Sequence, residues 1–134
     1  MGLIFDTSVL IDLERKAGEI EQSFAGRENE PFGISTVTAA ELLHGVHRAN
    51  NRKRRLIREA FVERVLLEFP ILPFDLSAAR TYAGIWAGLA KKGIQVGAHD
   101  LMIASTAISL GYSILTSNLR HYSRIEGLSI ESLE

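Results

Sequence analysis

Short apolar runs alternate along the chain with segments whose apolar residues recur every three or four positions. The short runs predict buried strands, at residues 2–5, 32–35 and 112–115, with a very short strand between Pro70 and Pro73 and an edge strand near residues 128–130. The periodic segments predict helices, at residues 9–15, 19–25, 37–48, 52–68, 77–93, 101–110 and 120–122. Ser77 is expected to cap the fifth helix, and Gly111 to end the sixth in a left-handed conformation.

This order of strands and helices predicts an α/β protein. Parallel strands need a crossover connection, which is usually a helix. We therefore expect one domain, residues 1–134, folded as a three-layer α/β/α sandwich around a short, mainly parallel sheet. In such folds ligands bind beyond the carboxyl ends of the strands, so polar residues directly after a strand are the first candidates for function.

The periodicity also predicts which side chains are buried. The core faces of the two central helices are expected to be Ala39, Leu42, Leu43 and Val46 in helix 37–48, and Leu56, Ile57, Ala60, Phe61 and Val65 in helix 52–68. Tyr82 and Trp86 are expected in the core, with a dimer interface as the alternative.

Charge is distributed unevenly. The net charge is -1, so attraction to a polyanion must come from a local patch. Seven of the 15 basic residues lie in one stretch: Arg48, Arg52, Lys53, Arg54, Arg55, Arg58 and Arg64. This stretch predicts a positive helix face that is solvated or that contacts RNA or a protein partner.

The composition, 46% hydrophobic and 23% charged, is typical of a globular chain. The sequence contains no cysteine, which excludes disulfides and thiolate metal sites. No basic leader precedes the first predicted strand, and no apolar run is long enough to span a bilayer. We expect a cytoplasmic protein without a membrane segment.

Four polar residues stand where chemistry is expected. Asp6 directly follows the first strand, and Asn118 follows strand 112–115 after two further residues. Asp100 stands at the start of an almost wholly apolar helix, and Glu41 interrupts the apolar helix 37–48. The apolar neighbours predict burial, and buried carboxylates that lie close together repel one another unless cations neutralise them. We expect all four residues to meet at one edge of the sheet.

Oxygen ligands without cysteine or a paired histidine motif select Mg²⁺, or Mn²⁺, over zinc. Two such ions can activate water, hold a scissile phosphate and stabilise the leaving oxygen. The hypothesis is therefore phosphodiester hydrolysis. Asp6 and Asp100 are assigned as the main metal ligands, Glu41 as a ligand or as the base that orients the attacking water, and Asn118 as a neutral ligand or as a donor to one.

Each of these residues also has a purely structural interpretation. Asp6, Asp100 and Asn118 are of types that commonly cap helices or form turns. The segment Thr38-Ala39-Ala40-Glu41 matches a capping box, in which the glutamate bonds the cap amide. If all four residues lie close together, a catalytic site is favoured over the structural interpretation, because helix caps that act independently are not expected to cluster.

Other patterns are weaker. Glu41 and His44 have the Glu-x-x-His spacing of di-iron bundles, but the chain lacks the second copy that such sites need. His99, beside Asp100, is in a position to touch substrate. The other histidines and acids are expected on helix surfaces, in loops or as caps: His47, His121, Asp12, Glu14 and Asp75.

Two other functions suit an acidic α/β domain. A phosphorylated receiver domain would need a pair of early aspartates and a lysine after a late strand, but the only lysine pair, Lys91-Lys92, ends a helix. A catalytically silent module would use the acidic pocket to receive an arginine from a partner. RNA cleavage that requires Mg²⁺, Asp6 and Asp100 would exclude this second function.

Five ordered segments cover nearly the whole chain: IFDTSVLIDLER, ISTVTAAELLHGVHRA, ILPFDLSAARTYAGIWAGLAKKG, GAHDLMIASTA and ILTSNLRHYSRIEGL. Together they resemble the PIN-domain ribonucleases, and specifically the VapC toxins. The resemblance implies an α/β/α sandwich and metal-dependent endoribonuclease activity. It also implies the toxin role in a type II toxin-antitoxin system, neutralised by a VapB-like antitoxin that wraps the toxin and inserts near its active site.

The resemblance further implies a homodimer that assembles with antitoxin on operator DNA. The acidic quartet of the family falls on Asp6, Glu41, Asp100 and Asn118. Many PIN domains have aspartate at the last of these positions. With asparagine only three carboxylates remain, so a second metal is expected to bind weakly. Transfer, ribosomal and messenger RNA all remain candidate substrates.

Overall fold

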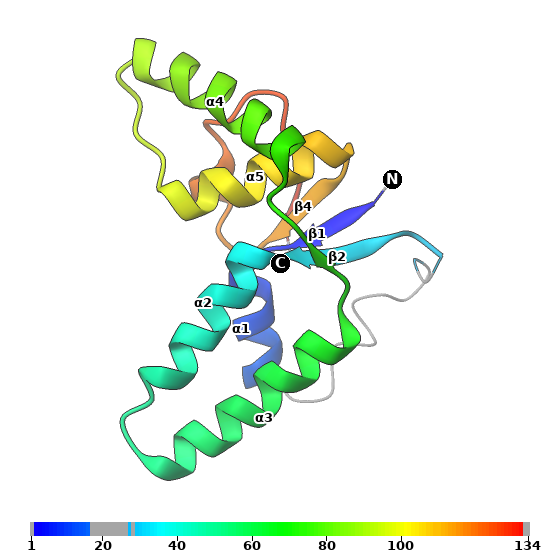
Figure 1. Cartoon of the computed structure of the whole chain (residues 1–134), viewed down its shortest axis with the longest axis vertical. Coiled ribbons are helices and arrows are strands. Elements are labelled where there is room, and N and C mark those ends of the chain that lie inside the picture. The colour runs from blue at the N-terminus through cyan, green and yellow to red at the C-terminus, as the bar shows by residue number, and fades with distance from the viewer. Residues whose placement is uncertain (1, 17–26, 28, 133–134) are drawn as a thin grey trace.

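The computed structural model describes residues 2–16, 27 and 29–132 (Figure 1). Within these residues the strands are β1 (Leu3–Phe5), β2 (Phe32–Ser35), β3 (Ile71–Leu72), β4 (Ser113–Thr116) and β5 (Ile130–Ser132). The helices of the same region are α1 (Thr7–Arg15), α2 (Thr36–His47), α3 (Arg52–Glu68), α4 (Leu76–Lys91), α5 (Ala98–Leu110) and α6 (Leu119–Tyr122). The strands form one sheet in the order β3-β2-β1-β4-β5, and each of these pairings is parallel.

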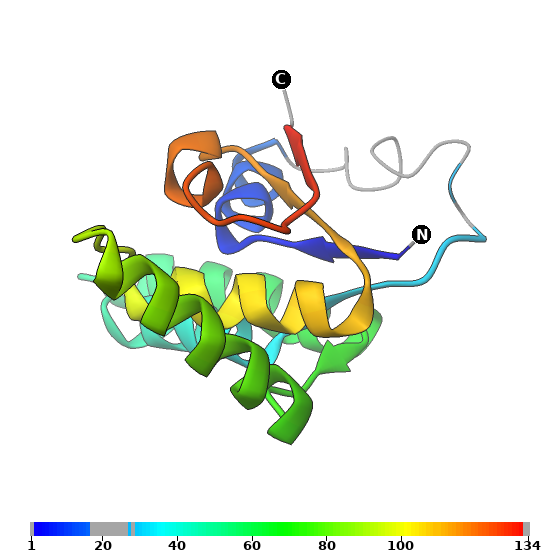
Figure 2. The same ribbon diagram turned by 90° about the horizontal axis from the view of Figure 1, so that it is seen from above.

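Helices cover both faces of the sheet. Leu3 and Phe5 of β1 pack with residues of α1, α2 and α3, whereas Ile4, which points to the opposite face, packs with residues of α4, α5 and α6. Figure 1 shows α4 and α5 on one side of the sheet and α1, α2 and α3 on the other. The helices α4 and α5 also lie side by side in the view from above (Figure 2). The predicted α/β/α sandwich is confirmed.

The position of β1 decides where function is expected. This strand lies in the middle of the sheet, with Leu3 opposite Phe32 of β2 on one side and opposite Ser113 of β4 on the other. Because the three strands run in the same direction, their carboxyl ends lie at one edge of the sheet. Asp6, Ser35 and Thr116 therefore lie at that edge.

Most element bounds follow the sequence pattern. The bounds of β2 and α3 are those predicted, whereas β4 and β5 begin one and two residues later than predicted. Helix α5 begins at Ala98, so Asp100 lies in its first turn and does not precede it. The helix predicted at residues 19–25 lies outside the described residues.

Two predicted helix ends have different outcomes. Gly111 ends α5 with a φ of 71°, the left-handed conformation that glycine adopts without strain. Ser77 is not the cap of α4, because that helix begins at Leu76. Asp75 caps it instead, and its Oδ1 accepts a hydrogen bond from the amide of Ala78 at 2.9 Å.

Several apolar side chains predicted to be buried are exposed. Leu56 and Ile57 are 55% and 60% exposed, and Leu43 and Trp86 are also exposed. Helix α3 buries Val65, as predicted, and also Val62, because its second half approaches the sheet while its first half lies far from it (Figure 1). Among the described helices, none has both the length and the apolar character that a membrane crossing requires.

Candidate active site

Asp6 lies at the centre of the carboxyl edge of the sheet, where its side chain is buried at 4% exposure. It precedes α1, yet its carboxylate makes no capping bond to that helix. Its Oδ2 accepts hydrogen bonds from Ser8 Oγ at 2.7 Å and from Thr116 Oγ1 at 2.9 Å, and its Oδ1 accepts one from the hydroxyl of Tyr122 at 2.7 Å. Three hydroxyl donors thus replace water around a buried acid. The interpretation of Asp6 as a side-chain cap is thereby excluded.

Asp100 lies half-buried in the first turn of α5, close to Asp6. Its Oδ1 is 3.4 Å from the hydroxyl of Tyr122, and its Oδ2 is 3.2 Å from His121 Nδ1. Burial raises the pKa of Asp100 above its ordinary value, and the negative charges of Asp6 and Glu41 raise it further, against the opposing effect of His121. Asp6 and Glu41 are therefore close enough to Asp100 to act on it electrostatically.

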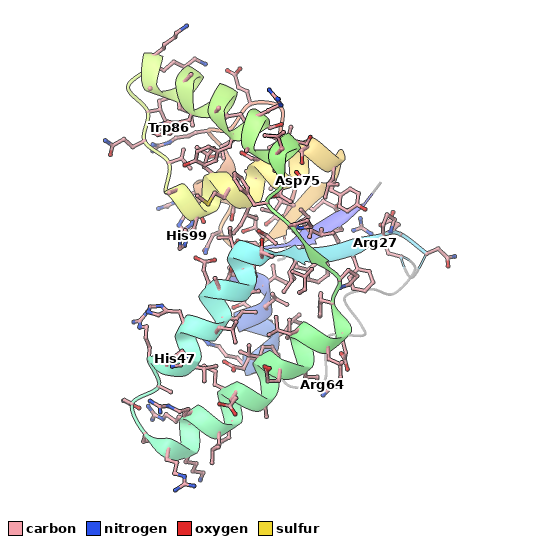
Figure 3. The ribbon with its side chains drawn as sticks, in the orientation of Figure 1. Arg27, His47, Arg64, Asp75, Trp86 and His99 are labelled. Atoms are coloured by element: carbon pink, nitrogen blue, oxygen red, sulfur yellow. The ribbon has the colours of Figure 1, made fainter. Side chains whose placement is uncertain are left out.

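Glu41 is not part of a capping box. Helix α2 begins at Thr36, and its cap is Ser35, whose Oγ accepts a bond from the amide of Val37 at 3.0 Å. The Oε1 of Glu41 accepts a hydrogen bond from Thr7 Oγ1 at 2.6 Å, and its Oε2 lies 3.4 Å from His99 Nδ1. Thr7 follows Asp6 and His99 precedes Asp100, so Glu41 borders the same edge. Figure 3 labels His99 at the start of α5, where it lies close to α2.

Asn118 is exposed, contrary to the predicted burial, and it directly precedes the short helix α6. Its backbone is nevertheless fixed, since its amide donates to Thr116 Oγ1 at 2.9 Å. The preceding residue, Ser117, donates from its amide to Ser8 Oγ at 3.1 Å and from its hydroxyl to Asp12 Oδ2 at 2.5 Å. Asp12, predicted as a surface residue of a helix, therefore anchors the loop that carries Asn118.

The sequence pattern did not single out the hydroxyl residues of the site. Ser8, Thr116 and Tyr122 all donate to Asp6. Ser8 lies in the first turn of α1, shortly after β1, and Thr116 is the last residue of β4. The signal that was available is the repeated pair Thr7-Ser8 and Thr116-Ser117, one pair near each of two neighbouring strand ends. Tyr122 offered no such signal, because an aromatic residue at a helix end is usually part of the core.

The side chains fit a hard divalent cation through the chemistry of their donors. Among the described residues, no three acidic or histidine side chains converge closely enough to hold a metal ion together. Mg²⁺ does not require such a cage, because it usually binds through one or two carboxylates and completes its octahedral shell with water and substrate phosphate. Asp6 and Asp100 contact the same hydroxyl and so form a pair of neighbouring carboxylates of the kind that could hold such an ion.

A groove of about 790 Å³ opens beside Glu41 and His99, between α1, α2 and α3. Ile11, Leu42 and Phe61 contribute apolar surface to it. Basic side chains also line it, namely Arg15, Arg48 and Arg58. Arg58 is held by the carbonyl oxygen of Gly45 at 3.3 Å and by Glu14 at 3.8 Å. The groove therefore combines apolar walls with positive charge next to the acidic edge.

Comparison with known proteins gives consistent matches. The model of the PIN domain family matches residues 3–128. The chain is 44% identical over 130 residues to ribonuclease VapC1 of Rickettsia felis, which covers 97% of this chain and 95% of the relative. It is 40% identical over 132 residues to the tRNA(fMet)-specific endonuclease VapC of Salmonella typhimurium, with 98% and 97% covered.

A solved structure extends the likeness to three dimensions. The crystal structure of DNA-bound VapBC from Salmonella typhimurium contains a chain that matches with a TM-score of 0.85 at 34% identity, with 98% of each chain covered. This structural match covers almost the whole of the fold described above. The chain belongs to the PIN-domain family and, within it, to the VapC ribonuclease toxins of VapBC toxin-antitoxin systems.

Proposed function

We propose that this ribonuclease toxin hydrolyses RNA with the help of Mg²⁺, or of Mn²⁺ as a substitute, and that Asp6 and Asp100 hold the metal. The observation that supports this proposal is the shared contact of the two carboxylates with the hydroxyl of Tyr122. Residues 94 positions apart in the chain thus face one point. A bound divalent ion would polarise the scissile phosphate and stabilise the charge of the leaving oxygen.

The other two residues of the quartet have roles that suit their positions. The hydroxyl of Thr7 holds Oε1 of Glu41, while Oε2, which faces His99 Nδ1 at 3.4 Å, is proposed to accept a proton from the attacking water or to ligate metal. The proposed role of Glu41 is therefore that of base or third ligand. Asn118, exposed at the start of α6, is proposed to contact the RNA backbone or to act as a neutral ligand.

The metal-carboxylate mechanism is tested by RNA cleavage with Mg²⁺, with EDTA, and with the variants Asp6→Asn and Asp100→Asn. EDTA is expected to abolish cleavage, and the cleavage rate of each variant is expected to be about 100-fold or more below that of the parent. The matched control is Glu126→Gln, which removes an exposed carboxylate paired with Lys92. Cleavage that persists in EDTA, or in both aspartate variants, would contradict the proposal.

Transfer RNA is the proposed substrate class. It is supported by the 40% identity to an endonuclease that is specific for tRNA(fMet). The test is to sequence the 5′ ends of RNA fragments after brief expression of the toxin, with the Asp6→Asn variant as the background sample. New ends are expected within tRNA loops, where bases are unstacked and accessible. New ends found only in messenger or ribosomal RNA would refute this substrate class.

The proposed partner is a VapB-like antitoxin that covers the groove beside Glu41. This choice is supported by the solved VapBC complex and by the apolar walls of the groove, which suit a protein segment.

The toxin is proposed to act in the cytoplasm, and to form a homodimer that joins the antitoxin on operator DNA.

Groove occupancy is tested with Ile11→Arg, which places a charge in the groove. Its control is Leu67→Arg, which changes an apolar residue that is 86% exposed on α3. Antitoxin is expected to bind Ile11→Arg at least 10-fold more weakly and Leu67→Arg normally, as measured by titration. Equal affinities would exclude the groove as the antitoxin site.

A further inference from the structure

Tyr122 is a fully buried tyrosine at the acidic edge whose role the family match does not assign. It ends α6, the four-residue helix that begins directly after Asn118. Its hydroxyl donates to Asp6 Oδ1 at 2.7 Å and lies 3.4 Å from Asp100 Oδ1. One hydroxyl group therefore lies between the two carboxylates that are proposed to bind metal.

The hydroxyl of Tyr122 is the donor in its contacts with both acids. A tyrosine hydroxyl can donate or accept a hydrogen bond, whereas an ionised carboxylate can only accept one, so the proton of the Tyr122 hydroxyl lies towards Asp6 and Asp100.

The contact between Tyr122 and Asp6 does more than satisfy a buried hydroxyl. Asp6 Oδ2 already has two donors, Ser8 and Thr116, whereas Oδ1 receives its one hydrogen bond within the described residues from Tyr122. Without this donor the Asp6 carboxylate would be held at only one of its oxygens. The carboxylate could then swing about Oδ2, the oxygen that Ser8 and Thr116 hold, and Oδ1 would have no fixed position.

We propose that Tyr122 is a positioning residue: its hydroxyl fixes Oδ1 of Asp6 and sets the spacing between Asp6 and Asp100 at which a divalent metal binds. This inference rests on the metal dependence proposed above. Groups that hydrogen-bond to ligating carboxylates orient them, and the loss of such a group typically costs about 10-fold to 100-fold in metal affinity or activity.

The test is Tyr122→Phe, which removes the hydroxyl and keeps the ring in the core. The matched control is Tyr112→Phe, since Tyr112 is a partly buried tyrosine that packs against the same hydrophobic cluster away from the acids. Mg²⁺ affinity is measured by calorimetry on the RNA-free protein, and kcat and KM by RNA cleavage. Tyr122→Phe is expected to weaken Mg²⁺ binding about 10-fold or more and to lower kcat with little change in the KM for RNA. Tyr112→Phe is expected to match the parent.

The outcomes separate positioning from packing. A Tyr122→Phe protein that melts at lower temperature but binds Mg²⁺ and cleaves RNA like the parent would overturn the assignment, because only packing would have changed. If Mg²⁺ does not bind the parent protein, the proposed metal dependence itself is wrong and Tyr122 loses the role with it. Weaker Mg²⁺ binding in Tyr122→Phe, with the parent and Tyr112→Phe normal, supports the assignment.

A second measurement covers the case in which Tyr122→Phe does not fold. The three tyrosines of the folded parent are replaced by 3-fluorotyrosine, and their ¹⁹F resonances are assigned with the variants Tyr82→Phe and Tyr112→Phe. Addition of Mg²⁺ is expected to shift the resonance of residue 122 in a saturable way and to leave that of residue 112 in place. A resonance of residue 122 that does not respond while Mg²⁺ binds would overturn the proposal.

Discussion

Asp100 faces His121 at the acidic edge, with Oδ2 of the aspartate 3.2 Å from Nδ1 of the histidine. Even with this partner the pKa of Asp100 is raised, because burial and the nearby charges of Asp6 and Glu41 outweigh the contribution of His121. The folded protein therefore holds this carboxylate at a cost to stability. Such a cost is typical of functional sites, where acids are kept together for chemistry.

Asp100→Asn is expected to raise the melting temperature by a few degrees at pH 7 while it abolishes cleavage. An acid whose pKa is raised on folding contributes stability below its unfolded pKa, and this contribution is lost as the pH rises through the folded value. The advantage of the variant should therefore be largest at neutral pH and disappear below about pH 4, near the ordinary pKa of aspartate. Melting curves across this range check the prediction, and a variant less stable than the parent at pH 7 would refute it.

Glu41→Gln is expected to lower the cleavage rate by about 100-fold or more, because an amide cannot take a proton from water. The substitution keeps the shape of the side chain and an oxygen that accepts from Thr7. Single-turnover cleavage at saturating Mg²⁺ measures the effect. Glu63→Gln on the exposed side of α3 is the control and should cleave like the parent. Equal rates for the two variants would remove Glu41 from the mechanism.

Asn118→Asp is expected to lower the Mg²⁺ concentration at which cleavage is half-maximal. The variant adds a fourth carboxylate at the acidic edge, and hard cations bind more tightly as the number of charged ligands rises. A titration of cleavage with Mg²⁺ gives the midpoint. Asn50→Asp, in the loop before α3, adds the same charge at a distance and should leave the midpoint unchanged. An unchanged midpoint in Asn118→Asp would show that this side chain does not face the metal.

Glu131→Gln is expected to destabilise the fold by about 0.5 to 1 kcal/mol without an effect on cleavage. Arg27 donates to both oxygens of Glu131, at 2.7 and 2.9 Å, and so joins the chain before β2 to the edge strand β5. Both side chains are partly exposed, which limits how much their ion pair stabilises the fold. Equilibrium unfolding in urea measures the difference.

The same pair predicts a dependence on pH. The hydrogen bond from Arg27 lowers the pKa of Glu131 in the folded protein. The stability that Glu131 contributes is therefore present above the ordinary glutamate pKa and is lost as the pH falls through the pKa of the folded state. The stability difference between Glu131→Gln and the parent should accordingly vanish in acid. A difference that persists at low pH would mean that the effect has another origin.

The fold was largely predictable because its elements are short and strongly patterned. Buried parallel strands appear as apolar runs, and β2 has the predicted bounds for that reason. The helix α3 also has the predicted bounds. Periodicity along one helix does not reveal how far its neighbours extend. Leu56 and Ile57 lie in the half of α3 that is far from the sheet, and Trp86 of α4 is 60% exposed. The exposure of all three side chains depends on tertiary contacts.

The candidate site was predictable only in part. Asp6 and Asp100 stood out as acids beside apolar segments, and the structure brings both of them to the hydroxyl of Tyr122. Their role in catalysis stays a prediction. The hydroxyl donors were not identified, because a sequence gives the type of a polar side chain but not its partner, which for Thr116 and Tyr122 lies more than 100 positions away. The exposure of Asn118 follows from the same limit, since it depends on how α6 lies against the sheet.

The order in which the chain is made has a consequence for the cell that makes this toxin. Asp6 emerges from the ribosome more than 100 residues before Thr116 and Tyr122, which donate hydrogen bonds to it. A growing chain thus carries its central acid long before these two donors. Products of translation that stop before Tyr122 should accordingly be harmless to cellular RNA, and toxicity should require a chain that extends beyond this residue.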